Sequence, residues 1–185
     1  MSLGAAGCIR ASLGSDPVTA FTQGVSRTFS LSYGTAATLF NLINFLIVLC
    51  INRSYIHFGT ILSVVLTGIF CDSFLYGMSL LHIEQSPLFV RTVILLLSTV
   101  LTAVGLGLYQ AAGLGISPGD ALIQTAAGSL PFSLGAVRVS YDLLLTAGAL
   151  GLGGVIHIGT LAGIMLTGPV MSRTFRWACD RCRRR

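Results

Sequence analysis

Residues 112–122, with the sequence AGLGISPGDAL, decide the fold that we expect for this chain. Pro118 lacks a backbone N–H and the glycines around it add backbone freedom, so a helix that reaches this segment must end. Proline is favoured in the first turn of a helix, so a new helix is expected to begin at Pro118. A similar motif, ASLGSDPVTAF, stands at residues 11–21. The chain is therefore predicted to contain two equivalent helix breaks.

The similarity between the two halves of the chain continues beyond these breaks. LSYGTAATLFNL at 31–42 aligns with FSLGAVRVSYDL at 132–143 at the same offset. After a slip of one residue, IHFGTILSVVLTG at 56–68 aligns with VIHIGTLAGIMLTG at 155–168. Recurrence at a fixed period indicates repeated structural units, so we predict a tandem duplication. The predicted units are a first membrane repeat at 1–86, a second membrane repeat at 87–178 and an Arg-rich tail at 179–185.

The composition places both repeats in a membrane. Of the 185 residues, 54% are hydrophobic and 9% are charged, whereas about a quarter of the residues in soluble domains are charged. A soluble protein of this size could not bury so much apolar surface. A helix of about 20 apolar residues spans the hydrocarbon core of a bilayer, and several segments are that long. We therefore expect an all-α integral membrane protein whose main partner is the lipid bilayer.

Each repeat is expected to contain a long helix, a half-helix and two further transmembrane helices. In the second repeat these lie at Leu88–Ala112, Pro118–Gly128, Ser133–Gly153 and Ile158–Ala178. The half-helix is too short to cross the bilayer and is predicted to be re-entrant. In the first repeat the half-helix and the two spans lie at Pro17–Ser26, Ser32–Ile51 and Phe58–Leu80. Its first helix is short, so we expect a truncated helix and a natural start upstream.

The distribution of charge sets the expected orientation. All 11 basic residues are Arg, and most of them lie in RTFRWACDRCRRR at 173–185. Cytoplasmic segments carry an excess of basic residues, so we expect a cytoplasmic C-terminus, with Arg53 inside and Glu84 outside. Arg27 and Arg91 run against this trend. With three spans in each repeat, the two repeats would be inverted, and their half-helices would meet near the midplane as in many secondary transporters.

Polar side chains inside the predicted spans are the first candidates for a site. Asp142 lies well inside its span, where a charge costs about 2.5–3.5 kcal/mol. Arg138, one turn earlier, is placed to form an i, i+4 ion pair with Asp142. Such a pair either fixes packing alone or belongs to a binding site. Asn41 aligns with Asp142 in the first repeat, so the two side chains would converge on one site.

Polar residues at the two helix breaks complete the candidate set. Freed backbone groups and the positive ends of half-helices suit an anion or a polar substrate. Side chains of the same kind also cap helix N-termini, and both interpretations stay open. For a small polar or ionic substrate of unknown identity, the predicted site residues are Asn41, Asp142, Arg138, Ser117, Asp120 and Asp16.

Several functional classes are not indicated by the sequence. It contains no motif of an enzyme or a nucleotide site, so we expect no enzyme and no cofactor. Cys179 and Cys182 form a C-x-x-C motif without the second pair that zinc would need. The net charge of +5 does not indicate nucleic-acid binding, because no soluble domain displays it. Two alternatives remain: a small transporter or permease component, or a non-transporting membrane protein that binds or regulates a partner. A homo-oligomer is compatible with both.

The doubled pattern G-L-G-x-S-P-x-D, S-x-G, G-T and L-x-G-P resembles the YczE/YyaS/YitT family of bacterial membrane proteins, and most closely its YczE branch. The matching residues are Gly113–Asp120, Ser133–Gly135, Gly159–Thr160 and Leu166–Pro169, with weaker matches in the first repeat. The similarity covers most of the chain. It implies a multi-pass protein of the bacterial plasma membrane and, at most, a transporter of undefined substrate. It assigns no catalytic residue.

Overall fold

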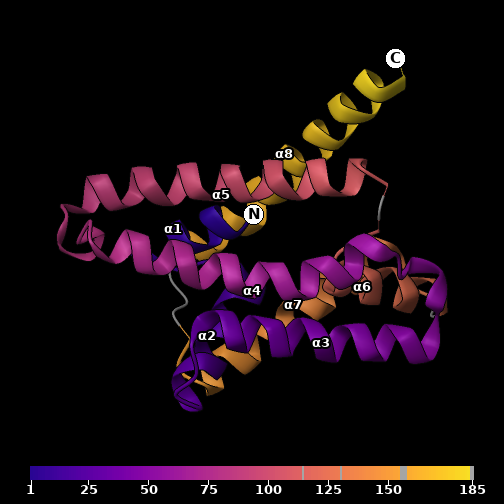
Figure 1. Cartoon of the computed structure of the whole chain (residues 1–185), viewed down its shortest axis with the longest axis horizontal. Helices are drawn as coiled ribbons and strands as arrows, with labels where there is room; N and C mark the ends of the chain where they lie inside the picture. The colour runs from indigo at the N-terminus through magenta and orange to yellow at the C-terminus, as the bar shows by residue number, and fades with distance from the viewer. Residues whose placement is uncertain (114, 130, 155–157, 184–185) are drawn as a thin grey trace.

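A computed structural model describes residues 1–113, 115–129, 131–154 and 158–183 of the chain (Figure 1). These residues form helices and connecting segments, with no strand among them, so the all-α prediction is confirmed. The helices are α1 (Ser2–Ala11), α2 (Pro17–Thr28), α3 (Tyr33–Ile51), α4 (Phe58–Ser79), α5 (Leu88–Ala111), α6 (Pro118–Ser129), α7 (Leu134–Gly151) and α8 (Ile158–Arg183). Short 3-10 turns connect α3 to α4 and α4 to α5, and these are η1 (Arg53–Tyr55) and η2 (Ile83–Gln85).

The helix breaks lie where the sequence predicts them. Between α1 and α2, Ser12 and Gly14 have φ angles of 51° and 95°. Between α5 and α6, Gly113 and Gly115 have φ angles of 67° and 128°. Left-handed backbone ends the preceding helix, and glycine adopts it at little steric cost. A proline then occupies the first residue of both α2 and α6.

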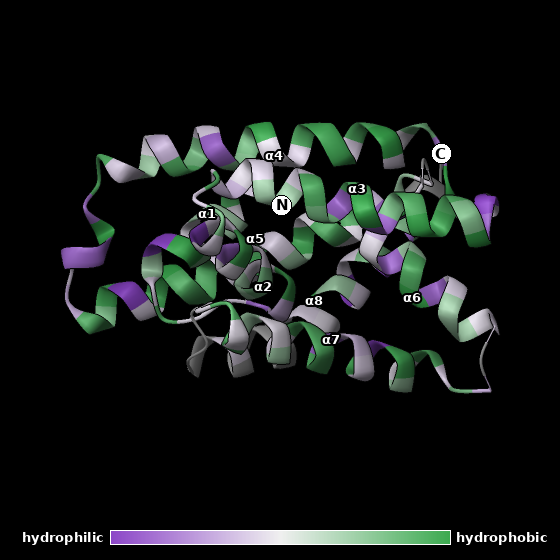
Figure 2. Cartoon of the chain, turned by 90° about the horizontal axis from the view of Figure 1, so that it is seen from below, coloured by the Kyte–Doolittle hydropathy of each residue, from purple (hydrophilic) through white to green (hydrophobic). Residues whose placement is uncertain are grey.

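Three helices are long and apolar enough to cross a membrane, as judged from the length and composition of the described residues: α3, α4 and α5. They expose large apolar side chains, such as Ile69 and Leu97, which are 57% and 65% exposed. Figure 2 shows the apolar residues along these helices. Buried positions are mostly small, as at Ala6, Ala36 and Ala103. Helices with small residues at their contacts pack closely in lipid, so this arrangement supports a membrane location. The spans predicted over α7 and α8 stay predictions.

Each short helix packs against a longer helix from the other half of the chain. Helix α2 packs against α7, and α6 packs against α3. Helices α1 and α5 contact each other, while α4 packs against α1 and α8 packs against α5. In Figure 1, α2 and α6 lie toward opposite ends of the molecule. The first residues of the two short helices, Pro17 and Pro118, nevertheless line one cavity.

Helices α3 and α4 approach closely because two glycines face each other. A Cβ on Gly34 would overlap the carbonyl oxygen of Gly68, and a Cβ on Gly68 would overlap Oγ1 of Thr38. Asp72 on α4 accepts a hydrogen bond of 2.6 Å from the backbone N–H of Gly34 and one of 2.6 Å from the hydroxyl of Ser32. The first turn of α3 is therefore held by a carboxylate from α4.

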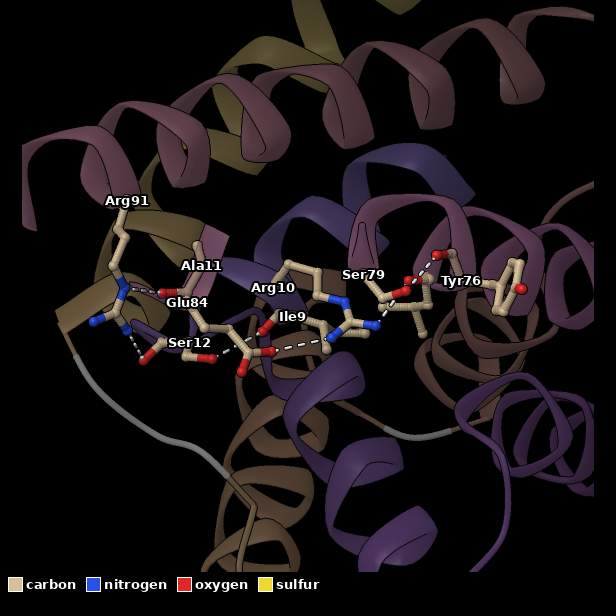
Figure 3. Close-up of polar contacts among 9 residues, drawn as sticks. Ile9, Arg10, Ala11, Ser12, Tyr76, Ser79, Glu84 and Arg91 are labelled. Carbon is tan, nitrogen blue, oxygen red and sulfur yellow. Dashed lines mark hydrogen bonds and ion pairs between the residues drawn. The ribbon is translucent and has the colours of Figure 1, made fainter. Parts of the chain in front are cut away.

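The two arginines that run against the predicted charge trend are held by backbone carbonyl groups. Arg91 on α5 donates hydrogen bonds of 2.8 Å and 3.2 Å to the carbonyl oxygens of Ala11 and Ser12 (Figure 3). Arg27 donates one of 3.3 Å to the carbonyl oxygen of Gly153. Carbonyl groups at a helix C-terminus lack partners within the helix, and cationic side chains satisfy them well. These arginines therefore stabilise helix ends and are weak markers of orientation.

Helix α8 is longer than the predicted span. It runs without interruption from Ile158 to Arg183 and includes much of the segment that we expected as a separate tail. Arginine is a good helix former, so an Arg-rich segment can continue a helix. Residues 184–185 lie outside the described ranges.

Candidate functional site

A cavity of about 460 Å³ is lined by both helix breaks. Its volume falls within the range of about 300–1,000 Å³ that is usual for small-molecule sites. Helices α3, α7 and α8 contribute further lining residues. The structure therefore brings together all six candidate residues, which line this cavity: Asp16, Asn41, Ser117, Asp120, Arg138 and Asp142.

At the first break, the side chain of Asp16 caps α2. Its Oδ2 atom accepts a hydrogen bond of 3.2 Å from the backbone N–H of Thr19. This contact satisfies one of the N–H groups that lack partners at a helix start. Asp16 and Thr19 also line the cavity, so the capping interpretation and the site interpretation apply to the same residue.

At the second break, the carboxylate of Asp120 accepts hydrogen bonds from three side chains. Ser117 donates at 2.9 Å and Gln110 at 3.1 Å, both to Oδ2, while Arg138 contacts Oδ1 at 3.2 Å. Ser117 also caps α6, since its Oγ accepts from the backbone N–H of Asp120 at 3.3 Å. Asp120 is 9% exposed. The sequence analysis did not select Gln110 as a site residue. The one feature that could have indicated it is the presence of an amide in the last turn of an apolar helix.

The predicted ion pair between Arg138 and Asp142 is wrong. Arg138 pairs with Asp120 instead, because α6 packs beside α7 and brings the Asp120 carboxylate to 3.2 Å from the guanidinium group. Asp142 is half-buried and lines the cavity. Its carboxylate forms no hydrogen bond or ion pair with any residue that the structure describes. Asp142 is thus available to a ligand, whereas Asp120 is already occupied.

Aromatic side chains line the cavity beside the two aligned polar residues. Phe40 precedes Asn41 on α3, Tyr141 precedes Asp142 on α7, and Tyr33 adds a third ring. Sequence reasoning did not select these rings. The alignment of 31–42 with 132–143 contained the signal, because it places Phe40 opposite Tyr141.

The Gly-Thr motif of the first half positions the break of the second half. Thr60, at the start of α4, donates a hydrogen bond of 3.1 Å to the carbonyl oxygen of Ile116. A Cβ on Gly115 would lie 2.5 Å from Oγ1 of Thr60, so glycine permits this approach. The motif that carries the family resemblance therefore supports the backbone next to Ser117.

The chemistry of the cavity suits the binding of a small polar or charged molecule. It presents a carboxylate that forms no hydrogen bond or ion pair with a described residue, a neutral amide, hydroxyl groups and aromatic rings. Among the described residues, no group of three or more His, Cys, Asp or Glu side chains could hold a metal ion.

Comparison with known proteins is consistent with this structure. A family model described as "Family of unknown function (DUF6198)" matches residues 1–176. The chain is also 28% identical over 159 residues to the "Uncharacterized membrane protein YczE" of Bacillus subtilis (strain 168). The aligned region covers 86% of this chain and 72% of that protein. The resemblance to the YczE branch is thus confirmed. No solved structure matches the chain significantly.

Proposed function

We propose that this chain, which belongs to the family of unknown function DUF6198, is a small secondary transporter or permease component. Its substrate site would be the cavity. One observation carries the proposal: both helix breaks, Asn41 and Asp142 line the same cavity. In many secondary transporters, interrupted helices from two repeats meet at the substrate site. An ionisable residue inside a membrane protein is a functional-site candidate by default.

The proposal includes an inverted repeat with two re-entrant half-helices, α2 and α6. Each has 12 residues, or about 18 Å of helix, which is less than the hydrocarbon core of about 30 Å. The helix contacts support a repeat. In the proposed repeat, α1, α2, α3 and α4 correspond to α5, α6, α7 and α8. The contact of α1 with α4 then corresponds to that of α5 with α8, and the contact of α2 with α7 corresponds to that of α6 with α3; all four contacts are present. The opposite placement of α2 and α6 in Figure 1 supports inversion.

The proposed transporter is a multi-pass protein of the bacterial plasma membrane with its C-terminus in the cytoplasm. In Figure 1 the connection at Arg53 and the C-terminal end of α8 lie toward one end, and the connection at Glu84 lies toward the other. This arrangement agrees with an excess of arginine on the cytoplasmic side. Single cysteines at positions 54, 86 and 179 test it. An impermeant thiol reagent added outside intact cells should label position 86 alone, and labelling of position 179 would contradict the orientation.

A difference between two helix pairs supports a mechanism of alternating access. Helices α3 and α4 are in contact at Gly34 and Gly68. For the aligned residues of α7 and α8, Gly135 and Gly168, a Cβ would meet no described residue within 4 Å, and both glycines line the cavity. The proposed cycle exchanges these two states, so that α7 and α8 close on each other as α3 and α4 separate.

An uptake screen in proteoliposomes tests the transport function. The purified chain is reconstituted, a panel of small polar and ionic solutes is offered, and Asp142→Asn is assayed with any solute that enters. Because the Asp142 carboxylate forms no hydrogen bond or ion pair within the described part of the chain, this substitution should remove a ligand contact at little cost to folding. Uptake should fall about 100-fold or more, equivalent to about 2.7 kcal/mol. The matched control is Asp180→Asn, the same change on the exposed end of α8, which should keep full uptake.

Two results would contradict the transport function. One is full uptake by Asp142→Asn of a solute that the unaltered chain transports, because the cavity would then not be the site. The other is an absence of uptake for the whole panel under each ion gradient tested. That second result would favour the alternative function, a membrane protein that binds or regulates a partner.

A further inference from the structure

The side chains that line the cavity and are charged at neutral pH carry a net negative charge. They are Asp16, Asp120, Asp142 and Arg138, three carboxylates and one guanidinium. Arg138 is engaged with Asp120 at 3.2 Å, and Asp120 also accepts from Ser117 and Gln110. Asp142 is therefore left as a half-buried carboxylate that forms no hydrogen bond or ion pair among the described residues, and Arg138 offsets its charge only from a distance. A desolvated charge of this kind is costly unless a partner compensates it.

The features of the cavity that could attract an anion are already engaged. The N-terminal end of α2 is capped by Asp16, and that of α6 is capped by Ser117 with Asp120 in its first turn. These carboxylates offset the positive ends of the two helix dipoles. Since Arg138 is paired with Asp120, an anion in the cavity would meet the Asp142 carboxylate, and the amino terminus of Met1 is the remaining source of positive charge among the lining residues.

The remaining lining suits an organic cation. Tyr33, Phe40 and Tyr141 line the same cavity as the polar residues Asn41 and Asp142. Aromatic faces attract ammonium groups, most strongly when water is excluded, and a carboxylate supplies the balancing charge. Helices α3 and α7 thus place the sequence pairs Phe-Asn and Tyr-Asp at the same cavity.

We infer that the cavity binds a small organic cation of the ammonium class, with the Asp142 carboxylate as its counter-charge and the rings of Phe40, Tyr33 and Tyr141 around its alkyl groups. This inference rests on the proposed function, because it names the substrate class of the same site. An inorganic cation would use the carboxylate but gain less from three aromatic rings. An anion is the class that the lining disfavours.

Direct binding to the purified chain in detergent tests this inference without transport. The probe is tetramethylammonium chloride, and helix melting followed by circular dichroism gives its apparent affinity. Sodium chloride at equal ionic strength, sodium methanesulfonate and the neutral analogue neopentyl alcohol serve as comparisons. For this experiment the chain is prepared with an acetylated amino terminus. Met1 also lines the cavity, and its free amino group would add a positive charge. Tetramethylammonium should raise the melting midpoint, and the three comparison solutes should not.

Two substitutions in opposite directions make the binding test specific. Asp142→Asn should weaken tetramethylammonium binding about tenfold or more, because it removes the counter-charge. Asn41→Asp adds a carboxylate at the aligned position and should strengthen binding, which keeps the test decisive if Asp142→Asn folds poorly. Asp180→Asn should leave the affinity unchanged. Stabilisation by methanesulfonate alone, no stabilisation by tetramethylammonium, or equal binding by Asp142→Asn would each overturn the inference.

The results for binding and uptake separate the two proposals. Tetramethylammonium binding that depends on Asp142, without uptake of any solute, would overturn the transport function and support the cation site. Uptake of an anion or a neutral solute by a chain that binds no tetramethylammonium would overturn the cation site and support transport.

Discussion

The helix pairs α3–α4 and α7–α8 have glycines at aligned positions but are packed differently. Gly34 and Gly68 bring α3 and α4 so close that a Cβ on either residue would overlap the other helix. Gly135 and Gly168 align with them, yet a Cβ on either would meet nothing within 4 Å among the residues that the structure describes. Asp72 reinforces the first contact through Gly34 and Ser32, and Ser172 stands at the aligned position on α8.

This difference shows that similar local sequence does not fix how two helices pack. Small residues permit a close approach in both halves. A carboxylate from the neighbouring helix secures it in the first half, and the cavity extends between the helices in the second. The first pair is thus held in close contact, while the second leaves open space beside the aligned glycines in the described part of the chain. Four predictions follow this comparison outward, two at the helix pairs, one at the helix breaks and one at an exposed ion pair.

The largest effect is expected for Gly68→Ala. The added methyl group would collide with the backbone of Gly34 and the side chain of Thr38, so α3 and α4 must separate. We expect a loss of about 3 kcal/mol in the free energy of unfolding, the upper end for overpacking. Denaturation in mixed detergent micelles, followed by circular dichroism, measures it. Gly168→Ala should be neutral or slightly stabilising, because alanine favours helix. Equal losses for the two variants would refute the difference in packing.

The next effect is expected for Asp72→Ala. This change removes both hydrogen bonds of 2.6 Å that hold the start of α3. Hydrogen bonds to charged groups each contribute about 1.5–3 kcal/mol, and water can replace part of this at the helix end. We therefore expect the unfolding free energy to fall by about 2 kcal/mol. Ser172→Ala, on α8, should change it by less than about 0.5 kcal/mol. A large effect of Ser172→Ala would mean that α7 and α8 are also held together.

A smaller effect is expected at the helix breaks, where Asp120→Asn is compared with Asp16→Asn. The amide at position 120 carries no negative charge, so its contact with Arg138 is weaker. It also has one acceptor oxygen in place of two, so it cannot accept hydrogen bonds from all three donors. We expect a loss of about 1 kcal/mol in unfolding free energy. Asp16→Asn should cost less than about 0.5 kcal/mol, because asparagine caps helices as well as aspartate does. The reverse order would show that the first break carries the stronger network.

The smallest effect is expected for Glu84→Gln at the far end of α4. Arg10 on α1 contacts Glu84 at 3.1 Å and donates a bond of 2.8 Å to the carbonyl oxygen of Leu75 (Figure 3). Glu84 is 56% exposed, so the ion pair should contribute only about 0.5 kcal/mol. The difference between the variant and the unaltered chain should shrink as salt is raised from 0.05 M to 1 M, since salt screens exposed charges. A difference that persists at 1 M salt would place the pair in a less polar environment.

The sequence by itself determined the helical membrane class, the positions of the helix breaks and the set of candidate site residues. These features follow from local chemistry. Pro118 and its glycines must end one helix and favour the start of the next, and an apolar composition must be solvated by lipid. The alignment of the two halves also singled out Asn41 and Asp142, which line one cavity. The inverted arrangement of the halves stays a prediction.

Only the tertiary structure decided which polar groups are paired and which helices are in contact. Arg138 could reach either Asp142 on its own helix or Asp120 on α6, and the choice depends on how α6 packs beside α7. Gln110 joins Asp120 only because α5 ends beside α6. The same holds for the glycine pairs, whose sequences agree and whose packing does not. Such choices are made between segments far apart in the chain, where several pairings have similar local energies and the packing of the whole molecule selects one.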